Sequence, residues 1–142
     1  MHKEAQQFTF ADISVGHTAS FTQIISEDLV RSFAELSGDH SPLHIDKEYA
    51  RTTSYGKTIA HGMIAGMLFS RMVGMELPGK NGVYLSQQLH FRAPVIPGDE
   101  VTVSGEIIQK SEAIRAITVM LRMHNQKQEL CVDGAALVKL LI

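Results

Sequence analysis

The feature that most constrains this chain is a helical segment that is apolar around nearly its whole circumference. Residues 62–74 read GMIAGMLFSRMVG, and only Ser70 and Arg71 interrupt the apolar run. Other elements must cover such a helix on most of its sides. The segment is too short to cross a membrane, which takes about 20 apolar residues. We therefore expect a helix buried inside a protein core.

The residues after Gly82 alternate between apolar and polar, a pattern typical of strands with one buried face. Four runs show it, at residues 83–91, 101–107, 117–123 and 130–140. Consecutive strands with short turns between them predict an antiparallel meander. Because the apolar face of this sheet must cover the apolar helix, the sequence predicts an α+β fold with a curved antiparallel sheet wrapped around the helix.

The first half of the chain is predicted to hold one strand, at residues 18–25, followed mainly by helix. Ser26 is a favourable helix cap, and the two acidic residues after it suit the positive end of a helix dipole. Gly38 is expected to end that helix. Residues 39–46 are predicted to form an ordered loop, with Asp46 capping a short helix that follows.

Composition limits the functions open to the chain. Its 142 residues suit one domain, and no linker or repeat divides residues 1–142. A net charge of −2 leaves no broad basic surface for nucleic acid or an anionic membrane. The single Cys131 can form neither an internal disulfide nor a four-cysteine zinc site, so we expect a small buried side chain. Without a signal-peptide pattern, a cytoplasmic location is expected.

The densest polar cluster is SGDHSPLH at residues 37–44. Asp39 and His44 are five residues apart with Pro42 between them, so an irregular loop can turn both side chains to one place. A carboxylate and an imidazole placed together can hold one water and move its protons. The alternative is that Asp39 only ends a helix or forms a turn, and that His44 is a solvated loop residue.

A second cluster lies just ahead of the apolar helix. The N–H of Gly62, with the helix dipole behind it, can stabilise a developing oxyanion, although close packing would explain this glycine equally well. His61 is expected to be a first-turn residue bonded to the backbone. The buried hydroxyl expected of Ser70 can simply bond back to its own helix.

These segments together resemble the R-specific enoyl-CoA hydratases, also called hydratase 2 or MaoC-like dehydratases. The similarity is clearest in FAELSGDHSPLH at residues 33–44, where the family pattern is G-D-x-N-P-[LIV]-H. It continues in the family's order through AHGM at 60–63, LFS at 68–70, LPG at 77–79, FRAPV at 91–95 and GDEV at 98–101. Ser41 departs from the pattern, since the family has asparagine there.

The resemblance implies the hot-dog fold, in which an antiparallel sheet wraps around a long central helix. It also implies reversible syn addition of water to trans-2-enoyl-CoA, which gives (R)-3-hydroxyacyl-CoA without a cofactor or a metal. The expected partners are an acyl-CoA or acyl-carrier-protein thioester and a second copy of the chain. Members of the family work as homodimers or assemblies of dimers, with the acyl pocket near the subunit interface.

Carried onto this sequence, the resemblance makes Asp39 and His44 the catalytic pair. Gly62 would donate its N–H to the thioester carbonyl, and Ser70 matches a serine that supports the active site. Ser41 would orient the loop or a water, with a shorter reach than asparagine. The residues expected to line the acyl pocket are Met63, Met67 and Leu68.

Three other functions remain open from the sequence. An acyl-CoA thioesterase of the same fold would release a free thiol instead of adding water. A dehydratase of (3R)-hydroxyacyl thioesters on acyl carrier protein differs only in the group that carries the acyl chain. A non-catalytic acyl-CoA-binding module, which Ser41 would permit, binds without turnover.

Overall fold

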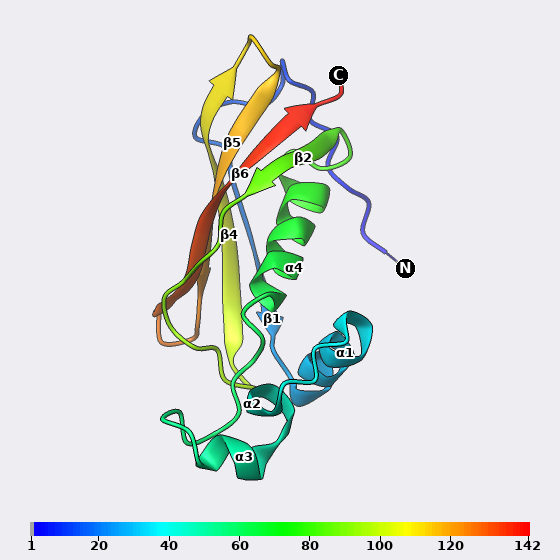
Figure 1. Ribbon diagram of the computed structural model, residues 1–142. Helices are drawn as coiled ribbons and strands as arrows, with labels where there is room; N and C mark the ends of the chain where they lie inside the picture. Colours follow the sequence, from blue (N-terminus) through cyan, green and yellow to red (C-terminus); the bar gives the residue numbers. More distant parts are fainter. Residues whose placement is uncertain (1) are drawn as a thin grey trace.

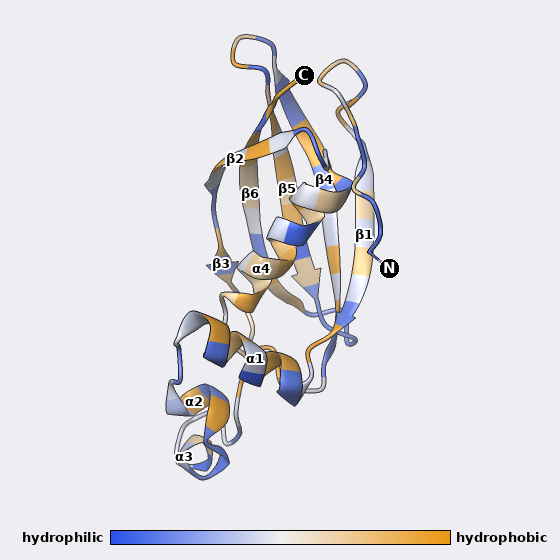
Figure 2. Ribbon diagram, turned by 90° about the vertical axis from the view of Figure 1, so that its right-hand side faces the viewer, coloured by the Kyte–Doolittle hydropathy of each residue, from blue (hydrophilic) through white to orange (hydrophobic). Residues whose placement is uncertain are grey.

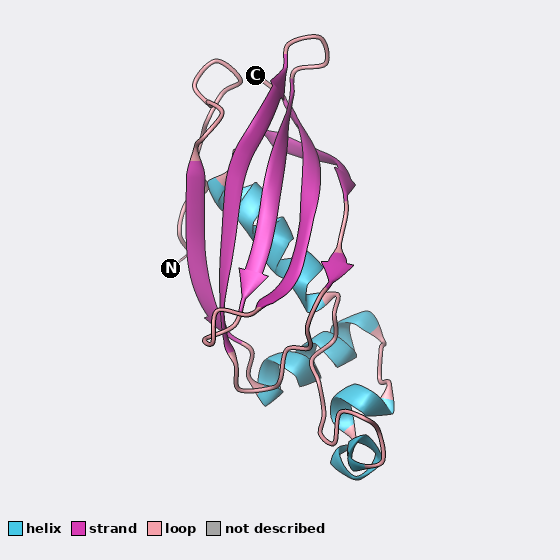
Figure 3. Cartoon of the chain, turned by 90° about the vertical axis from the view of Figure 1, so that its left-hand side faces the viewer, coloured by secondary structure: helices cyan, strands magenta, loops and turns pink. Residues whose placement is uncertain are grey.

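The computed structural model, which describes residues 2–142, has a curved antiparallel sheet wrapped around one face of helix α4 (Figure 1). Helix α4 spans Ile64–Arg71. The α+β arrangement expected from the sequence is therefore confirmed. Figure 3 shows the opposite, convex face of the same sheet, with the short helices gathered beyond one end.

The sheet joins strands in an order that differs in one place from the predicted meander. Its path is β1 (Thr18–Ile24), β4 (Glu100–Ser111), β5 (Ala116–His124), β6 (Leu130–Leu140) and β2 (Gly82–Gln87), and the short β3 (His90–Phe91) also pairs with β6. Strands β4, β5 and β6 form the predicted meander, but β2 pairs with β6 instead of β4. The connection at residues 92–99 holds two prolines and is too long for a tight hairpin, so β2 and β4 are not forced together.

The strand predicted at residues 83–91 is divided into β2 and β3. The pairing of β2 with β6 shifts register between Tyr84 and Ser86. Such a bulge bends a strand and changes which side chains face the core. Val83 and Leu85 are exposed, whereas the half-buried Tyr84 between them packs against the core.

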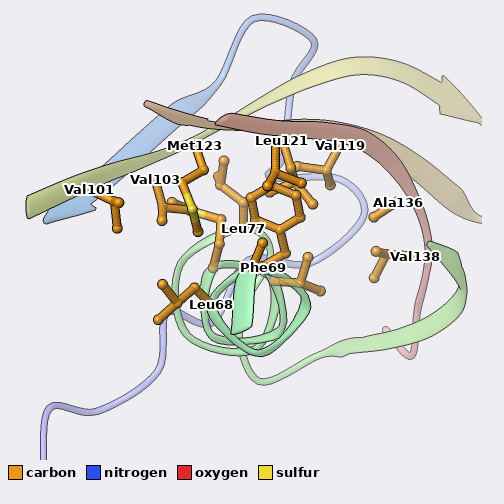
Figure 4. Packing of buried hydrophobic residues seen from close by; sticks show 14 of the residues in the cluster. Leu68, Phe69, Leu77, Val101, Val103, Val119, Leu121, Met123, Ala136 and Val138 are labelled. Atoms are coloured by element: carbon orange, nitrogen blue, oxygen red, sulfur yellow. The ribbon is translucent and has the colours of Figure 1, made fainter. Parts of the chain in front are cut away.

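The core lies between α4 and the concave face of the sheet (Figure 4). Phe69 is fully buried there, and the alternating residues of the strands cover it. The buried strand residues include Val101, Val103, Ile107, Ile117, Val119, Leu121, Met123, Ala136 and Val138. Each large apolar side chain contributes about 1.5–3 kcal/mol when fully buried, which holds the helix against the sheet. Cys131 is buried as predicted, and burial raises the pKa of its thiol.

The apolar helix differs from its prediction at both ends and on one face. Residues 62–63 form a turn before α4, and a π-helical segment, Met72–Glu76, follows it. The expectation that the helix is covered on most sides is wrong for a single chain, because the sheet covers only one side (Figure 2). Met63 is 56% and Met67 40% exposed. None of the helices within residues 2–142 is long and apolar enough to cross a membrane.

Three helices lie beyond the N-terminal end of α4 (Figure 1). Helix α1, Glu27–Ser37, begins and ends as predicted: the Ser26 hydroxyl accepts a hydrogen bond from the N–H of Leu29, and Gly38 has φ +79°. Helix α2, Pro42–Ile45, lies where a loop was predicted, because the fixed φ of proline favours a first helical turn. Asp46 caps α3, Lys47–Arg51, as predicted.

A salt bridge joins the first and third of these helices. Lys47 Nζ lies 3.0 Å from Glu27 Oε1, and the hydrogen bond and charge of Lys47 lower the pKa of the Glu27 carboxyl. Helix α2 lies between the two helices in the chain and also contacts both of them. The segment that carries Asp39 and His44 therefore lies between two helices that a surface salt bridge joins.

Candidate active site

Asp39 lies in a tight turn between α1 and α2. Its carboxylate Oδ1 accepts a hydrogen bond from the backbone N–H of Ser41 at 3.1 Å, and its own N–H donates to the Ser37 hydroxyl at 3.1 Å. Asparagine and aspartate favour turns closed in this way. The side chain of Asp39 is exposed, and the turn holds its carboxylate in a defined direction.

His44 lies in the last turn of α2, half-buried, with one ring nitrogen already engaged. Nδ1 donates a hydrogen bond to the backbone carbonyl of Ile59 at 2.8 Å. Since a carbonyl can only accept, the proton is on Nδ1, and Nε2 of the neutral ring keeps a free lone pair. This arrangement leaves Nε2 free to take up and release a proton.

The side chains of Asp39, His44 and His61 converge. One carboxylate oxygen of Asp39 and one ring nitrogen of each histidine lie within 4.8 Å of one another. The structure therefore brings together the two residues that the sequence placed in a catalytic pair. Their catalytic role itself stays a prediction.

His61 was not among the predicted site residues, although the expected backbone hydrogen bond is confirmed. Its Nε2 donates to the carbonyl of Asp39 at 2.9 Å, and its ring centroid lies 4.0 Å from that of His44. The sequence could not identify this contact because 22 residues separate His61 from Asp39. The only available signal was its position directly before Gly62 in the AHGM motif.

A cavity of about 220 Å³ opens beside His44, His61 and Gly62. Most of its wall is apolar, so it suits a ligand with a hydrocarbon part. Apolar residues in its wall include Ile25, Ile64, Ala65, Phe91, Met123 and Val132. The cavity therefore runs between the start of α4 and the ends of β3, β5 and β6.

Gly62 combines the two properties that the sequence left as alternatives. Within residues 2–142, no protein acceptor bonds the backbone N–H of Gly62, which lies in the cavity wall. A Cβ atom at this position would lie 2.8 Å from Cε1 of Phe91, so the aromatic ring packs directly on the glycine. An open amide and close packing are both present, and binding of an oxyanion by that amide stays a prediction.

The remaining predicted site residues lie away from this cavity. Ser70 is exposed, not buried as expected, and eight residues of helix place it about 12 Å along the axis from Gly62. Met63, just before α4, and Met67 within it are exposed, and Leu68 belongs to the core. None of the four is in the cavity wall, because α4 turns Ile64 and Ala65 toward it. Ser41 is exposed, and only its backbone N–H contacts Asp39.

The three converging side chains also offer donor atoms that Zn²⁺ accepts. Two of their ring nitrogens, however, already contact backbone carbonyls, and the two imidazole rings stack at 32° to one another. Rings that share one metal ion must instead point their lone pairs at a common position. The arrangement is better suited to hydrogen bonding, and the absence of a metal from the reaction stays a prediction.

Comparisons with known proteins point to one family. Residues 5–128 match the family model described as MaoC like domain. The chain is 41% identical to the (R)-specific enoyl-CoA hydratase of Aeromonas caviae over 128 residues, which cover 90% of this chain and 96% of that protein. It is 38% identical to the 3-hydroxybutyryl-CoA dehydratase of Methylorubrum extorquens over 139 residues, 98% and 88% of the two chains.

The solved structures give the same result for the fold. The unliganded R-hydratase of Pseudomonas aeruginosa superposes with a TM-score of 0.91 at 36% identity. The superposition covers 97% of this chain and 88% of that one. The curved sheet, the helix inside it and the helices at its end therefore recur together in that enzyme.

Proposed function

The chain belongs to the MaoC-like domain family and has its hot-dog fold, and from this we propose that it is an (R)-specific enoyl-CoA hydratase. As a hydro-lyase it adds water reversibly to a trans-2-enoyl thioester and gives the (R)-3-hydroxyacyl thioester. The observation that carries the proposal is the convergence of the Asp39 carboxylate and the His44 imidazole beside an apolar cavity.

The proposed chemistry uses one water between Asp39 and His44. Two atoms no more than 4.8 Å apart can both hydrogen-bond the same water at about 2.8 Å. The pair removes one proton from this water as its oxygen bonds to the β-carbon of the substrate. It then returns a proton to the α-carbon on the same face. One water is consumed and no electrons are exchanged, so we propose that the reaction needs no cofactor.

Negative charge develops on the thioester oxygen when water attacks the β-carbon. We assign its stabilisation to the N–H of Gly62, which is unpaired within residues 2–142 and lies in the same cavity wall as His44. A preorganised amide of this kind contributes roughly 10²–10³ in rate. The acyl chain would occupy the apolar cavity, and its carrier, coenzyme A or acyl carrier protein, would remain outside.

A homodimer is the proposed assembly, because one apolar surface of the single chain is left open. It consists of exposed side chains on α4 and the residue before it and on the neighbouring β2–β3 edge: Met63, Met67, Val83, Leu85 and Phe91. The contacts of Phe91 with Gly62 and of Leu89 with Gly66 place this edge beside α4. A second copy would bury the surface, so the methionines expected to line the acyl pocket would lie at the subunit interface. A cytoplasmic location also stays a prediction.

Replacing Leu85 by Glu is expected to convert the dimer to a monomer, since it puts a charge into the apolar surface. Leu85 is 51% exposed in the single chain, so folding of the monomer tolerates the change. Ile114→Glu, at an equally exposed position in the β4–β5 turn, is the matched control and should remain a dimer. Sedimentation velocity distinguishes the two. A monomeric wild-type chain, or a dimeric Leu85→Glu variant, would argue against this interface.

Ser41→Ala is expected to keep at least about half of the wild-type kcat. Asp39 is held by the backbone N–H of residue 41, which alanine retains, and the hydroxyl caps no helix. Ser41→Pro, which lacks that N–H, is the comparison that should lose activity. Steady-state hydration rates test both variants. A large loss in Ser41→Ala would assign the hydroxyl a direct part in the reaction.

The proposed function is tested with crotonyl-CoA and a thiol reagent in the same solution. A hydratase removes the absorbance of the conjugated enoyl thioester and releases no thiol, and chiral analysis of the product finds the (R)-alcohol. Free coenzyme A with loss of the thioester would identify a thioesterase instead. Saturable binding without any turnover would identify an acyl-CoA-binding module. A series of enoyl chain lengths on coenzyme A and on acyl carrier protein then defines the substrate.

A further inference from the structure

We propose that His61 is a positioning residue that fixes Asp39 relative to His44, an inference that rests on the proposed function of this site. His61 precedes α4, whereas Asp39 and His44 flank the start of α2. It is 3% exposed and contacts both of them. It thus connects the proposed catalytic pair to the turn that contains Gly62 and leads into α4.

The contact with Asp39 fixes a turn that is otherwise held only by its neighbours. Among the hydrogen bonds described for residues 2–142, those of Asp39 within its own turn involve only Ser37 and Ser41. The single bond from elsewhere in the chain is the one that His61 Nε2–H donates to the Asp39 carbonyl at 2.9 Å. Without this donor, the exposed turn and its carboxylate are free to shift relative to the cavity.

The contact with His44 is made by the face of the ring. The two imidazole centroids are 4.0 Å apart, and Phe33 of α1 also contacts His61, at 4.8 Å. A ring packed in this way limits rotation of the His44 side chain. Together with the Nδ1 bond of His44 to Ile59, it fixes the orientation of the His44 ring and therefore the direction of its free Nε2.

The other nitrogen of His61 indicates that packing alone does not explain this imidazole. Nδ1 is buried and has no hydrogen-bond partner within residues 2–142. Burying a polar atom without a partner is unfavourable, and a phenyl ring would fill the same space without that cost. An imidazole differs from a phenyl ring in the N–H that it donates to Asp39. We therefore assign the role of His61 in positioning Asp39 to that N–H donor.

Two variants of His61 distinguish the effect of its N–H donor from the effect of its ring packing. His61→Phe keeps an aromatic ring against His44 but removes the donor, and it is expected to lower kcat by about 10–100-fold with KM changed less than about 2-fold. His61→Gln places an amide N–H near the position of Nε2 and should restore kcat to within about 5-fold of wild type. Unchanged kcat in His61→Phe, or a glutamine variant no better than phenylalanine, would overturn the proposal.

A double-mutant comparison excludes a general structural effect. In an Asp39→Asn background there is no carboxylate left to position, so adding His61→Phe should change the residual rate less than about 3-fold. An equal loss in both backgrounds would mean that His61 only stabilises the fold, and would contradict the proposal.

Hydrogen exchange tests the same inference without any substrate. Backbone amides at residues 38–41 should exchange faster in His61→Phe than in wild type or His61→Gln, while the amides of β5 stay protected. Unaltered exchange at residues 38–41 would contradict the proposal. Because this readout needs no turnover, it remains decisive if the wild-type chain hydrates no enoyl thioester, a result that would reject the proposed function separately.

Discussion

Asp39→Asn and His44→Asn are each expected to lower kcat for crotonyl-CoA hydration by at least about 100-fold while the chain stays folded. Both changes keep the hydrogen bonds that hold the segment. An amide oxygen at position 39 still accepts from the N–H of Ser41, and an amide at position 44 still donates to the Ile59 carbonyl. What each variant loses is the group that takes up or returns a proton.

The control for this pair is His40→Asn, which changes an exposed histidine in the same segment. It should retain the wild-type kcat, because His40 is outside the wall of the apolar cavity. Circular dichroism and thermal unfolding establish that all three variants are folded. Hydration at a near-normal rate by either Asp39→Asn or His44→Asn would remove that residue from the mechanism.

Gly62→Pro is the second change with a large expected effect, because proline has no N–H to stabilise the thioester oxygen. We expect kcat to fall by a further 10²–10³-fold, roughly, below that of Gly62→Ala. The alanine variant keeps the N–H and adds the same Cβ, which would lie 2.8 Å from Phe91 Cε1. Proline is tolerated just before a helix, where the N–H has no intrahelical partner.

Comparing kcat of the two variants distinguishes the loss of the Gly62 N–H from the steric effect of the added Cβ on Phe91. Phe91 is 56% exposed, so its ring can move to accommodate a methyl group. Adding Phe91→Ala to both variants removes the close contact and should leave the difference between proline and alanine unchanged. If Gly62→Pro and Gly62→Ala turn over equally, the amide of Gly62 does not bind the oxyanion.

The sequence predicted those parts of the fold that depend on local pattern. Alternating burial in β4, β5 and β6, the Ser26 cap and the Gly38 stop follow from side-chain spacing and backbone preference, and all are confirmed. The place of β2 beside β6 could not be predicted, because spacing does not determine which strand a neighbour pairs with. The exposure of Met63 and Met67 was missed for a similar reason: periodicity defines a face but not what covers it.

The site was predictable to the extent that its residues lie close in the chain. Asp39 and His44 share one short segment, and a motif that resembles a known family identified them. The part that was missed, His61, depends on a contact between residues 22 positions apart. The predicted pocket residues were all taken from the apolar helical segment, whereas the cavity wall combines α4 with the ends of distant strands.

Hydration of crotonyl-CoA in D₂O most directly tests whether the oxygen and the proton are added to the same face of the substrate, as a single site formed by Asp39 and His44 requires. A single site on one face of the substrate predicts one diastereomer, with the hydroxyl at the β-carbon and the deuterium at the α-carbon added syn. NMR coupling constants of the product determine this relationship. A single syn diastereomer with (R) configuration at the β-carbon is the expected result. An anti product or a mixture of diastereomers would contradict the account.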